Sequence, residues 1–346
     1  MSRVARRLLL LVLIVLTPVV GWTFYRETSP GAELSDAAAE FVDLLDADQR
    51  KTALLSFEDD TAQRVEWHFI PKDHRKGLQI KHMNKRQREA AHALLEAALS
   101  QMGYSKAKRI MSIEALLAEI EGEGRFIRDP ERYYFTLFGA NFGGRWGLSI
   151  EGHHLSLNFV VADGKVISST PQFFAANPGV VMTENKSGFE QGTRILAKEE
   201  TLAFDLVNAL DDTQRAAAII DETAPREIRA AGELQPPQEA PAGIPAGQLT
   251  SEQQKVLRQL IEEYATAVPA KLSEERLAKI DADGFDGVHF AWAGATEPGI
   301  GHYYRIQGDS FLIEFVNTQP DVAGNPANHI HCVWRDMHGD FAIPAE

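Results

Sequence analysis

The expected architecture follows from residues 146–159, which read WGLSIEGHHLSLNF. The segments on either side of Glu151-Gly152 are rich in aromatic and branched apolar residues, and the glycine permits a tight turn between them. This pattern predicts two β-strands, over 146–150 and 154–161, that pair as an antiparallel hairpin. A similar segment at 133–138 predicts another strand just before them.

Helical patterns precede these strands. Apolar residues recur three and four positions apart over 37–56, 84–102 and 112–121, which predicts amphipathic helices there. Because the helices come first and the strands then follow in a run, the order favours an α+β fold over a parallel α/β sheet.

Several residues return later in the chain in the same order, which indicates an internal duplication. The collinear matches are Asp46, Gln49, Arg50 and Ala53 with Asp211, Gln214, Arg215 and Ala218; Leu94, Leu95 and Glu96 with Leu260, Ile261 and Glu262; Glu114, Leu117, Ala118 and Ile120 with Glu274, Leu277, Ala278 and Ile280; and Phe135, Gly139, Gly152 and Phe159 with Phe290, Gly294, Gly308 and Phe315. The second copy then predicts strands over 288–292, 303–306, 311–316 and 329–335.

The duplication sets the expected domain organisation. Residues 1–26 form a signal peptide or membrane anchor, 27–36 a short linker, 37–200 the first repeat and 201–346 the second. The proline-rich segment LQPPQEAPAGIPAG, residues 234–247, falls inside the second repeat. It is therefore expected to be a surface excursion and not a domain linker.

The first residues carry an export pattern. Arg3, Arg6 and Arg7 precede an uncharged apolar run from Leu8 to Phe24, as in signal peptides. The run is also just long enough to span a bilayer, so a cleaved signal and a retained anchor both stay open. In either case the positive-inside rule places the rest of the chain in the periplasm, in the extracellular space or at the outer face of the membrane. Contact with a membrane is expected only through this segment.

Composition excludes several classes of protein. With 35 Lys and Arg against 49 Asp and Glu, the net charge of -14 has the wrong sign for a nucleic-acid partner. The single cysteine, Cys332, excludes an internal disulfide and any metal site built from several cysteines. A metal site in this chain must therefore use histidine and carboxylate ligands.

The sharpest chemical signal is His329-Ile330-His331. Side chains two residues apart on a strand share a face, so both imidazoles can converge on one ion. A metal site needs one or two ligands more. The candidates are His302, Glu314, His153 and His154. Without sulfur ligands, zinc, copper and iron all stay open as the metal. The alternative is that the histidines only make structural hydrogen bonds.

Two of these ligand candidates are neighbours, and Arg335-Asp336 supplies the candidate catalytic residues. Leucines alternate with a serine after His154, which favours that histidine over His153. On a regular strand Arg335 shares the histidine face, where its guanidinium could bind a substrate carboxylate or stabilise an oxyanion. The alternative for Arg335 is a salt bridge, either to Asp336 of a neighbouring turn or to Glu314.

Four segments together carry a family resemblance. They are WGLSIEGHHLSLNF at 146–159, STPQFFAANPG at 169–179, HYYRIQG at 302–308 and NHIHCVWRD at 328–336. In these segments the sequence resembles the uncharacterised family catalogued as domain of unknown function 3500, and the likeness extends over residues 37–341. The resemblance implies a largely exported bacterial protein and supports the boundaries above, but it implies no particular activity.

Three functions remain open from the sequence. The leading expectation is an exported α+β protein that binds a transition metal through His329 and His331 and acts as a metal-dependent enzyme of unknown reaction. The second is a non-catalytic module that holds a small molecule or peptide in the cleft between the two copies. The third is a structural envelope protein whose histidines carry no chemistry.

Overall fold

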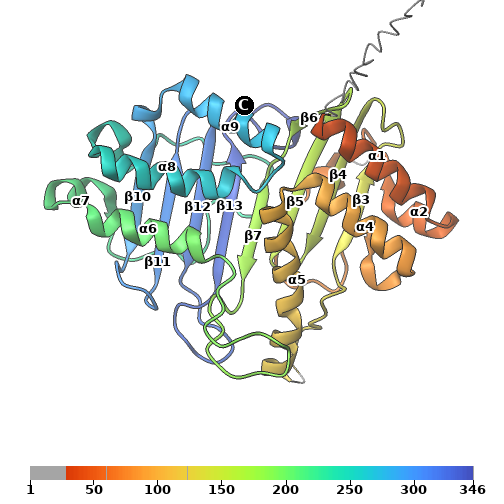
Figure 1. The fold of residues 1–346 in the computed structure, drawn as a ribbon, viewed down its shortest axis with the longest axis horizontal. Coiled ribbons are helices and arrows are strands. Elements are labelled where there is room, and N and C mark those ends of the chain that lie inside the picture. The colour runs from red at the N-terminus through yellow and green to blue at the C-terminus, as the bar shows by residue number, and fades with distance from the viewer. Residues whose placement is uncertain (1–28, 60, 123, 346) are drawn as a thin grey trace, which may run out of the picture.

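A computed structural model describes residues 29–59, 61–122 and 124–345. The expected signal peptide or membrane anchor, 1–26, lies outside these residues. Within them, helices and strands are built around one large sheet (Figure 1), which confirms a mixed helix-and-strand fold of the α+β kind.

The sheet contains thirteen strands within the described ranges, most of them in the order β1-β3-β4-β5-β7-β13-β12-β11-β10-β8. The short strands β2, β6 and β9 pair with β3, β5 and β10 respectively. The bounds are Leu54–Leu55 (β1), Leu78–Gln79 (β2), Tyr134–Phe138 (β3), Arg145–Gly152 (β4), Leu155–Ala162 (β5), Lys165–Ser168 (β6), Gln172–Ala176 (β7), Ile219–Asp221 (β8), Ile244–Pro245 (β9), His289–Gly294 (β10), His302–Gln307 (β11), Phe311–Asn317 (β12) and Ile330–Asp336 (β13).

The hairpin that the sequence predicted is formed by β4 and β5, which pair antiparallel. Its turn lies at His153-His154 and not at Glu151-Gly152, because β4 continues through Gly152. This glycine is needed for close packing: a Cβ atom at Gly152 would lie 2.2 Å from the ring of Tyr133. The correction matters because it moves His154 from the start of a strand into the turn, beside His153.

The central pairing joins β7 to β13, and it was not predicted. The two strands run antiparallel, with Phe174 opposite Cys332 and Ala176 opposite Ile330. β7 also pairs with β5, so it connects the strands of the first half to those of the second. The other predicted strands match β3, β4, β5 and β10 to β13 with small shifts at their ends.

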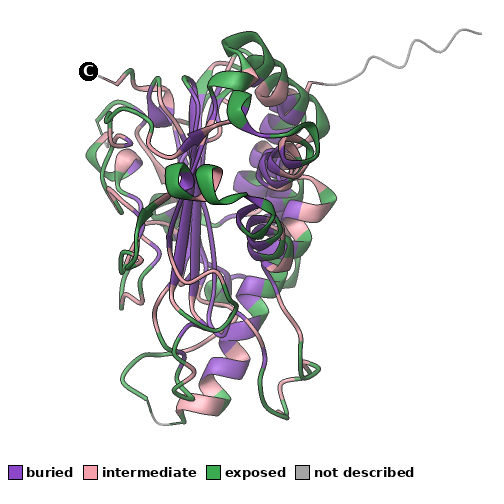
Figure 2. Cartoon of the chain, turned by 90° about the vertical axis from the view of Figure 1, so that its left-hand side faces the viewer, coloured by how far each residue is buried: buried purple, intermediate pink, exposed green. Residues whose placement is uncertain are grey.

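The longer helices all cover one face of the sheet (Figures 1 and 2). The bounds are Pro30–Asp43 (α1), Ala47–Ala53 (α2), Thr61–Val65 (α3), Lys85–Ala98 (α4), Gln101–Glu121 (α5), Ala197–Ala209 (α6), Asp212–Ala218 (α7), Ser251–Ala265 (α8) and Ala270–Asp283 (α9), with short 3-10 helices at Ile80–His82, Ala246–Gln248, Phe285–Gly287 and Asp340–Ala342. Among the described residues, no helix is both long and apolar enough to cross a bilayer.

The helix boundaries correct two expectations. Helix α1 begins at Pro30, inside the segment 27–36 that was expected to be a linker, because Ser29 accepts a hydrogen bond from a first-turn amide and proline suits the first helical position. The predicted helix over 37–56 is divided in two. Asp46 accepts hydrogen bonds from the amides of Asp48 and Gln49 and so starts α2 as a separate helix.

Irregular segments and the short helix α3 cover the other face of the sheet. Trp67 and Phe69 pack there against Phe173, in a separate apolar cluster that includes Val333 and Phe341. Figure 2 shows the buried sheet seen on edge, with the helices on one side and these segments on the other. Both faces are therefore closed to water, and any polar side chain between sheet and cover needs a partner.

A buried ion network ties the helices of the two halves together. The ammonium group of Lys106 on α5 donates to Glu199 of α6 at 2.6 Å and to Glu263 of α8 at 2.7 Å. Burial alone would lower the pKa of Lys106, but the two carboxylates outweigh that effect and raise the pKa above its ordinary value. The charged form of Lys106 is thus held by its partners.

Replacing this lysine tests the network. Lys106→Met leaves the buried Glu199 carboxylate without its counter-ion and leaves Glu263 only its 3.5 Å contact with Lys198, so the free energy of unfolding should fall by about 3–5 kcal/mol. Lys108→Met, at an exposed position of the same helix, serves as the control and should change it by less than about 0.5 kcal/mol. Chemical denaturation measures both, and equal stabilities for the two variants would contradict the role given to Lys106.

Candidate metal centre

His329 and His331 flank Ile330 where β13 begins. Ile330 and Cys332 point into the core beneath the helices. The two imidazoles share the opposite face, and their Nε2 atoms lie 3.1 Å apart. The structure therefore brings together the pair that strand alternation had indicated.

His154 reaches the same point from the turn between β4 and β5. Its Nε2 atom lies 2.9 Å from Nε2 of His329. The backbone holds it on both sides, because its amide donates to Phe69 and its carbonyl accepts from Ala175 of β7. Its φ of 65° is in the left-handed region, an uncommon conformation for a residue with a side chain. Strain of this kind persists where the surroundings fix the residue in place.

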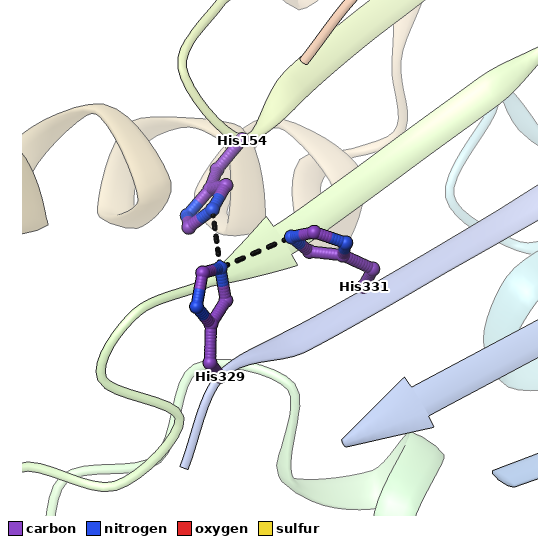
Figure 3. A group of neighbouring side chains, drawn as sticks. All are labelled: His154, His329 and His331. Atoms are coloured by element: carbon purple, nitrogen blue, oxygen red, sulfur yellow. Dashed lines mark hydrogen bonds between the residues drawn. The ribbon is translucent and has the colours of Figure 1, made fainter. Parts of the chain in front are cut away.

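The three imidazoles form a compact set of donors (Figure 3). One nitrogen from each of His154, His329 and His331 lies within 4.8 Å of the others. Two imidazole nitrogens bound to one zinc ion at about 2.0–2.1 Å in tetrahedral geometry would be about 3.3 Å apart. The observed contacts at 2.9 and 3.1 Å are close to that spacing, and only the third pair would have to approach.

Hydrogen bonds between the three rings cannot pair all of their nitrogen atoms. Nε2 of His329 faces the Nε2 atoms of both His154 and His331, but a ring nitrogen carries at most one hydrogen to donate. Nδ1 of His154, which is buried, has no partner among the described residues. A cation at the centre would use all three lone pairs at once.

Burial disfavours the protonated form of His154 and of His329, and a histidine must be unprotonated at the nitrogen that binds a metal. Burial, followed by the nearby His331 and Arg128, lowers the pKa of His329 to about 3. Burial also holds the pKa of His154 well below its ordinary value, and the neighbouring histidines add to the effect. Protonating His154 or His329 in the folded chain would therefore place a charge where water stabilises it poorly.

Glu227 orients the third ring. Its carboxylate oxygens lie 2.8 and 2.9 Å from Nδ1 of His331. A carboxylate accepts a hydrogen, so Nδ1 carries it and Nε2 presents its lone pair to the cluster. Metal-bound histidines commonly have such a carboxylate behind them.

Two phenylalanine rings and a fourth histidine, His153, lie around the three-histidine cluster. Phe69 and Phe173 stack at a centroid distance of 3.8 Å, and both contact His331. His153 stacks on His154 at 3.7 Å, and its Nδ1 lies 2.5 Å from a carboxylate oxygen of Glu114 on α5. His153 thus packs against a ligand candidate instead of joining the set.

Glu114, the partner of His153, has a raised pKa. Burial raises the pKa of Glu114 to about 8, although the nearby Arg128 lowers it in part. At neutral pH Glu114 is therefore mostly protonated and can donate to His153. Arg128 is held in turn by both carboxylate oxygens of Glu121, at 2.8 Å each. This network fixes His153, and through the stacked rings it fixes His154.

The remaining predicted residues lie elsewhere. His302 is on the opposite face of the sheet, where Nε2 lies 3.2 Å from Glu200 and the ring stacks on Trp292. Glu314 shares the face of His331, but it accepts hydrogen bonds from Arg229, at 2.9 Å, and from Tyr303. Neither side chain joins the three histidines.

The predicted catalytic pair also stays apart from the cluster. Arg335 lies on the histidine face as expected, but it is fully buried and its donors go to Asp340, at 2.5 Å, and to the carbonyls of Ala230 and Glu233. Asp336 ends β13 and accepts from the amide of His338. Arg335 therefore forms a buried salt bridge, as the alternative had it, but its acid is Asp340 and not Asp336 or Glu314.

Sequence reasoning missed Glu227, Glu114 and Phe69. Glu227 and Phe69 lie in irregular segments, and no spacing in the sequence relates them to the histidine strand. Glu114 was noted only as one residue of the repeat. Long-range packing places all three, so the sequence offered no signal for their role.

The neutral state of His329 predicts a pH dependence. An unfolded histidine titrates near pH 6.5, whereas folded His329 stays neutral to about pH 3. Between these values the unfolded chain binds a proton that the folded chain does not. The free energy of unfolding should therefore fall as the pH falls, with up to about 1.4 kcal/mol per pH unit from this group.

Urea unfolding of metal-stripped protein between about pH 7 and about pH 4 measures this contribution. His329→Gln should flatten the curve relative to the parent. The control is His338→Gln, whose side chain is 60% exposed and lies outside the cluster. Parallel curves for His329→Gln and the parent would show that the ring gains a proton as readily in the folded chain as in the unfolded one.

One family comparison covers nearly the whole chain. Residues 27–343 match the family described as "Protein of unknown function (DUF3500)". No curated protein and no solved structure matches the chain. The match agrees with the resemblance of the four quoted segments, three of which supply the residues of the hairpin, of β7 and of the histidine strand. The chain therefore belongs to the DUF3500 family.

Proposed function

We propose that this protein binds a transition-metal ion through the Nε2 atoms of His154, His329 and His331. The convergence of three imidazole nitrogens, one of them on a ring backed by the Glu227 carboxylate, is the observation that carries the proposal. A core does not bury three rings nitrogen to nitrogen without a partner for their lone pairs, because unsatisfied buried polar atoms cost free energy.

The kind of ligand atom limits which metals can bind. Imidazole nitrogen suits zinc, copper and iron, and no sulfur is available because Cys332 points to the opposite face. Burial also raises the pKa of the Cys332 thiol, which keeps it protonated. The choice among the three metals rests on measurement.

The number of protein ligands favours a catalytic role. Among residues 29–59, 61–122 and 124–345, no fourth histidine, cysteine or carboxylate joins the three ligands. Three protein ligands with one position left for water or substrate is the arrangement of catalytic sites, whereas structural zinc sites are closed. The ion would act there as a Lewis acid or, if it is copper or iron, as a redox centre.

We also propose that the chain is exported and that its two halves arose by duplication. The leader pattern of Arg3, Arg6, Arg7 and the apolar run after them supports export. Equivalent contacts in the two halves support the duplication. Gln49 bonds to the carbonyl of His82 and to Gln87, and Gln214 bonds in the same way to the carbonyl of Gln248 and to Gln253.

Metal analysis tests the centre directly. Tag-free protein is reconstituted with zinc, copper or iron salts, desalted and assayed by inductively coupled plasma mass spectrometry. The parent and His338→Gln should retain about one ion per chain. The double variant His329→Ala, His331→Ala should retain none, while circular dichroism shows it folded. A metal-free parent, or undiminished metal in the folded double variant, would end the proposal.

Glu227→Gln tests the role of the carboxylate behind His331. Its side chain is 33% exposed, so the variant should fold normally. Metal affinity, measured by competition with a chelator, should fall about 10–100-fold because the ligand ring loses its oriented partner. An unchanged affinity would show that Glu227 does not tune the centre.

Fractionation tests export. The full chain, produced in a bacterial host, should be digested by protease added outside the cytoplasmic membrane. Leu13→Arg, which places a charge within the apolar run, should retain the chain in the cytoplasm. The mass of the exported product separates a cleaved signal from a retained anchor. A parent chain that stays protected in the cytoplasm would overturn the assignment.

A further inference from the structure

A pocket of about 210 Å³ lies where the two halves meet, on the helix face of the sheet and away from the histidines. One wall comes from residues 166–170 of the first half, and the other comes from α9 and the ends of β12 and β13 in the second. Figure 1 shows α9 and β6 at the same end of the sheet. The space corresponds to about seven water molecules at about 30 Å³ each.

Arg276 of α9 is an unmatched cation in this pocket. Its guanidinium lies over the ring of Trp334 and donates only to neutral acceptors, which are the side-chain oxygens of Gln172 and Ser169 and the carbonyl of Ser169. Within the described ranges it forms no salt bridge, and its Nε makes no hydrogen bond. Burial lowers the pKa of Arg276 to about 9, against a smaller raising effect of Asp336.

Gln172 lies beside Arg276, and its side-chain amide has a donor without an acceptor in the described part of the chain. Gln172 is 2% exposed, and its amide oxygen faces the guanidinium, so its Nε2 points elsewhere. That Nε2 has no acceptor among the described residues. Arg276 thus brings its charge to the pocket with only neutral hydrogen-bond acceptors around it, and a ligand carboxylate would balance that charge.

The other residues that line the pocket favour a ligand that carries further groups besides a carboxylate. Asp336 and Glu275 also line it, together with a second cation, Lys279, so the lining carries charges of both signs and suits a ligand that also carries both. Ile167 is an apolar side chain left 46% exposed, and Phe311 and Leu272 continue the apolar wall. The complementary molecule carries a carboxylate, a positive group and a short apolar part.

We propose that this junction pocket binds a small zwitterion of the amino-acid type. The carboxylate of the ligand pairs with the Arg276 guanidinium, its ammonium group faces Asp336 and Glu275, and its apolar side chain packs on Ile167 and Phe311. None of the residues proposed to contact the ligand belongs to the metal centre. A ligand of this class would occupy the cleft between the two halves.

L-Leucine is the probe, and two analogues dissect it. 4-Methylpentanoate lacks the ammonium group and 3-methylbutylamine lacks the carboxylate. Calorimetric titration and thermal unfolding of the full chain should show that leucine binds and raises the melting temperature. Each analogue should bind at least about tenfold more weakly, because it leaves the charge on one side of the site without a partner.

Three variants locate the binding. Arg276→Met should weaken leucine binding at least about tenfold, whereas Arg258→Met should bind like the parent. Arg258 is the matched control because it also lies over an aromatic ring, Phe285, but outside the pocket. Ile167→Arg fills the mouth from an exposed position and should abolish binding without unfolding the chain. It keeps the test valid if Arg276→Met is unstable.

The outcomes separate this site from the metal centre. The double variant His329→Ala, His331→Ala should bind leucine like the parent even though it binds no metal. Absence of leucine binding, or equal binding by the parent and Ile167→Arg, would overturn the pocket. Equal binding of leucine and 4-methylpentanoate would overturn the zwitterion assignment.

Discussion

The antiparallel pairing of β7 with β13 is the contact on which the rest of the structure depends. It merges the strands of the two halves into one sheet, with Phe174 opposite Cys332 at its middle. The same pairing sets His331 opposite Ala175, whose amide bonds to the carbonyl of His154. A hairpin turn of the first half and the last strand of the second therefore meet at one point, and the histidine cluster exists only because the halves are joined in this register.

The sheet separates the chemistry of its two faces. On the helix side, alternate residues of β13 enter the main apolar core, and Lys106 pairs with two carboxylates between the helices. On the other side, irregular segments bring Phe69 and Glu227 over the histidines. The histidine cluster and the Arg276 pocket lie on opposite faces, but both straddle the join between the halves. Both sites draw residues from the two halves, so each keeps its geometry only while β7 and β13 stay paired.

The motif NHIHCVWRD shows how structural and chemical roles alternate along one strand. Its residues on one face pack beneath the helices, while His331 and Arg335 lie on the other. Arg335 has an internal acid and two carbonyls for its donors, so its charge is neutralised within the fold. His331 has its acid on one ring nitrogen and leaves the other for the cluster. The same strand thus carries one polar residue that stabilises the fold and one whose lone pair remains available.

The sequence by itself determined the helix-then-strand order, most strands of the sheet and the shared face of His329 and His331, because hydrophobic periodicity and strand alternation are local properties. It also favoured His154 over His153, since the residues that follow alternate. It did not indicate β7, whose short apolar segment carries no distinctive period, nor the helical start at Pro30. Tertiary structure decided which histidines meet, sent His302 to the opposite face and supplied Glu227, Glu114 and the unpaired Arg276. These depend on contacts between residues far apart in the chain, and no local pattern encodes such contacts.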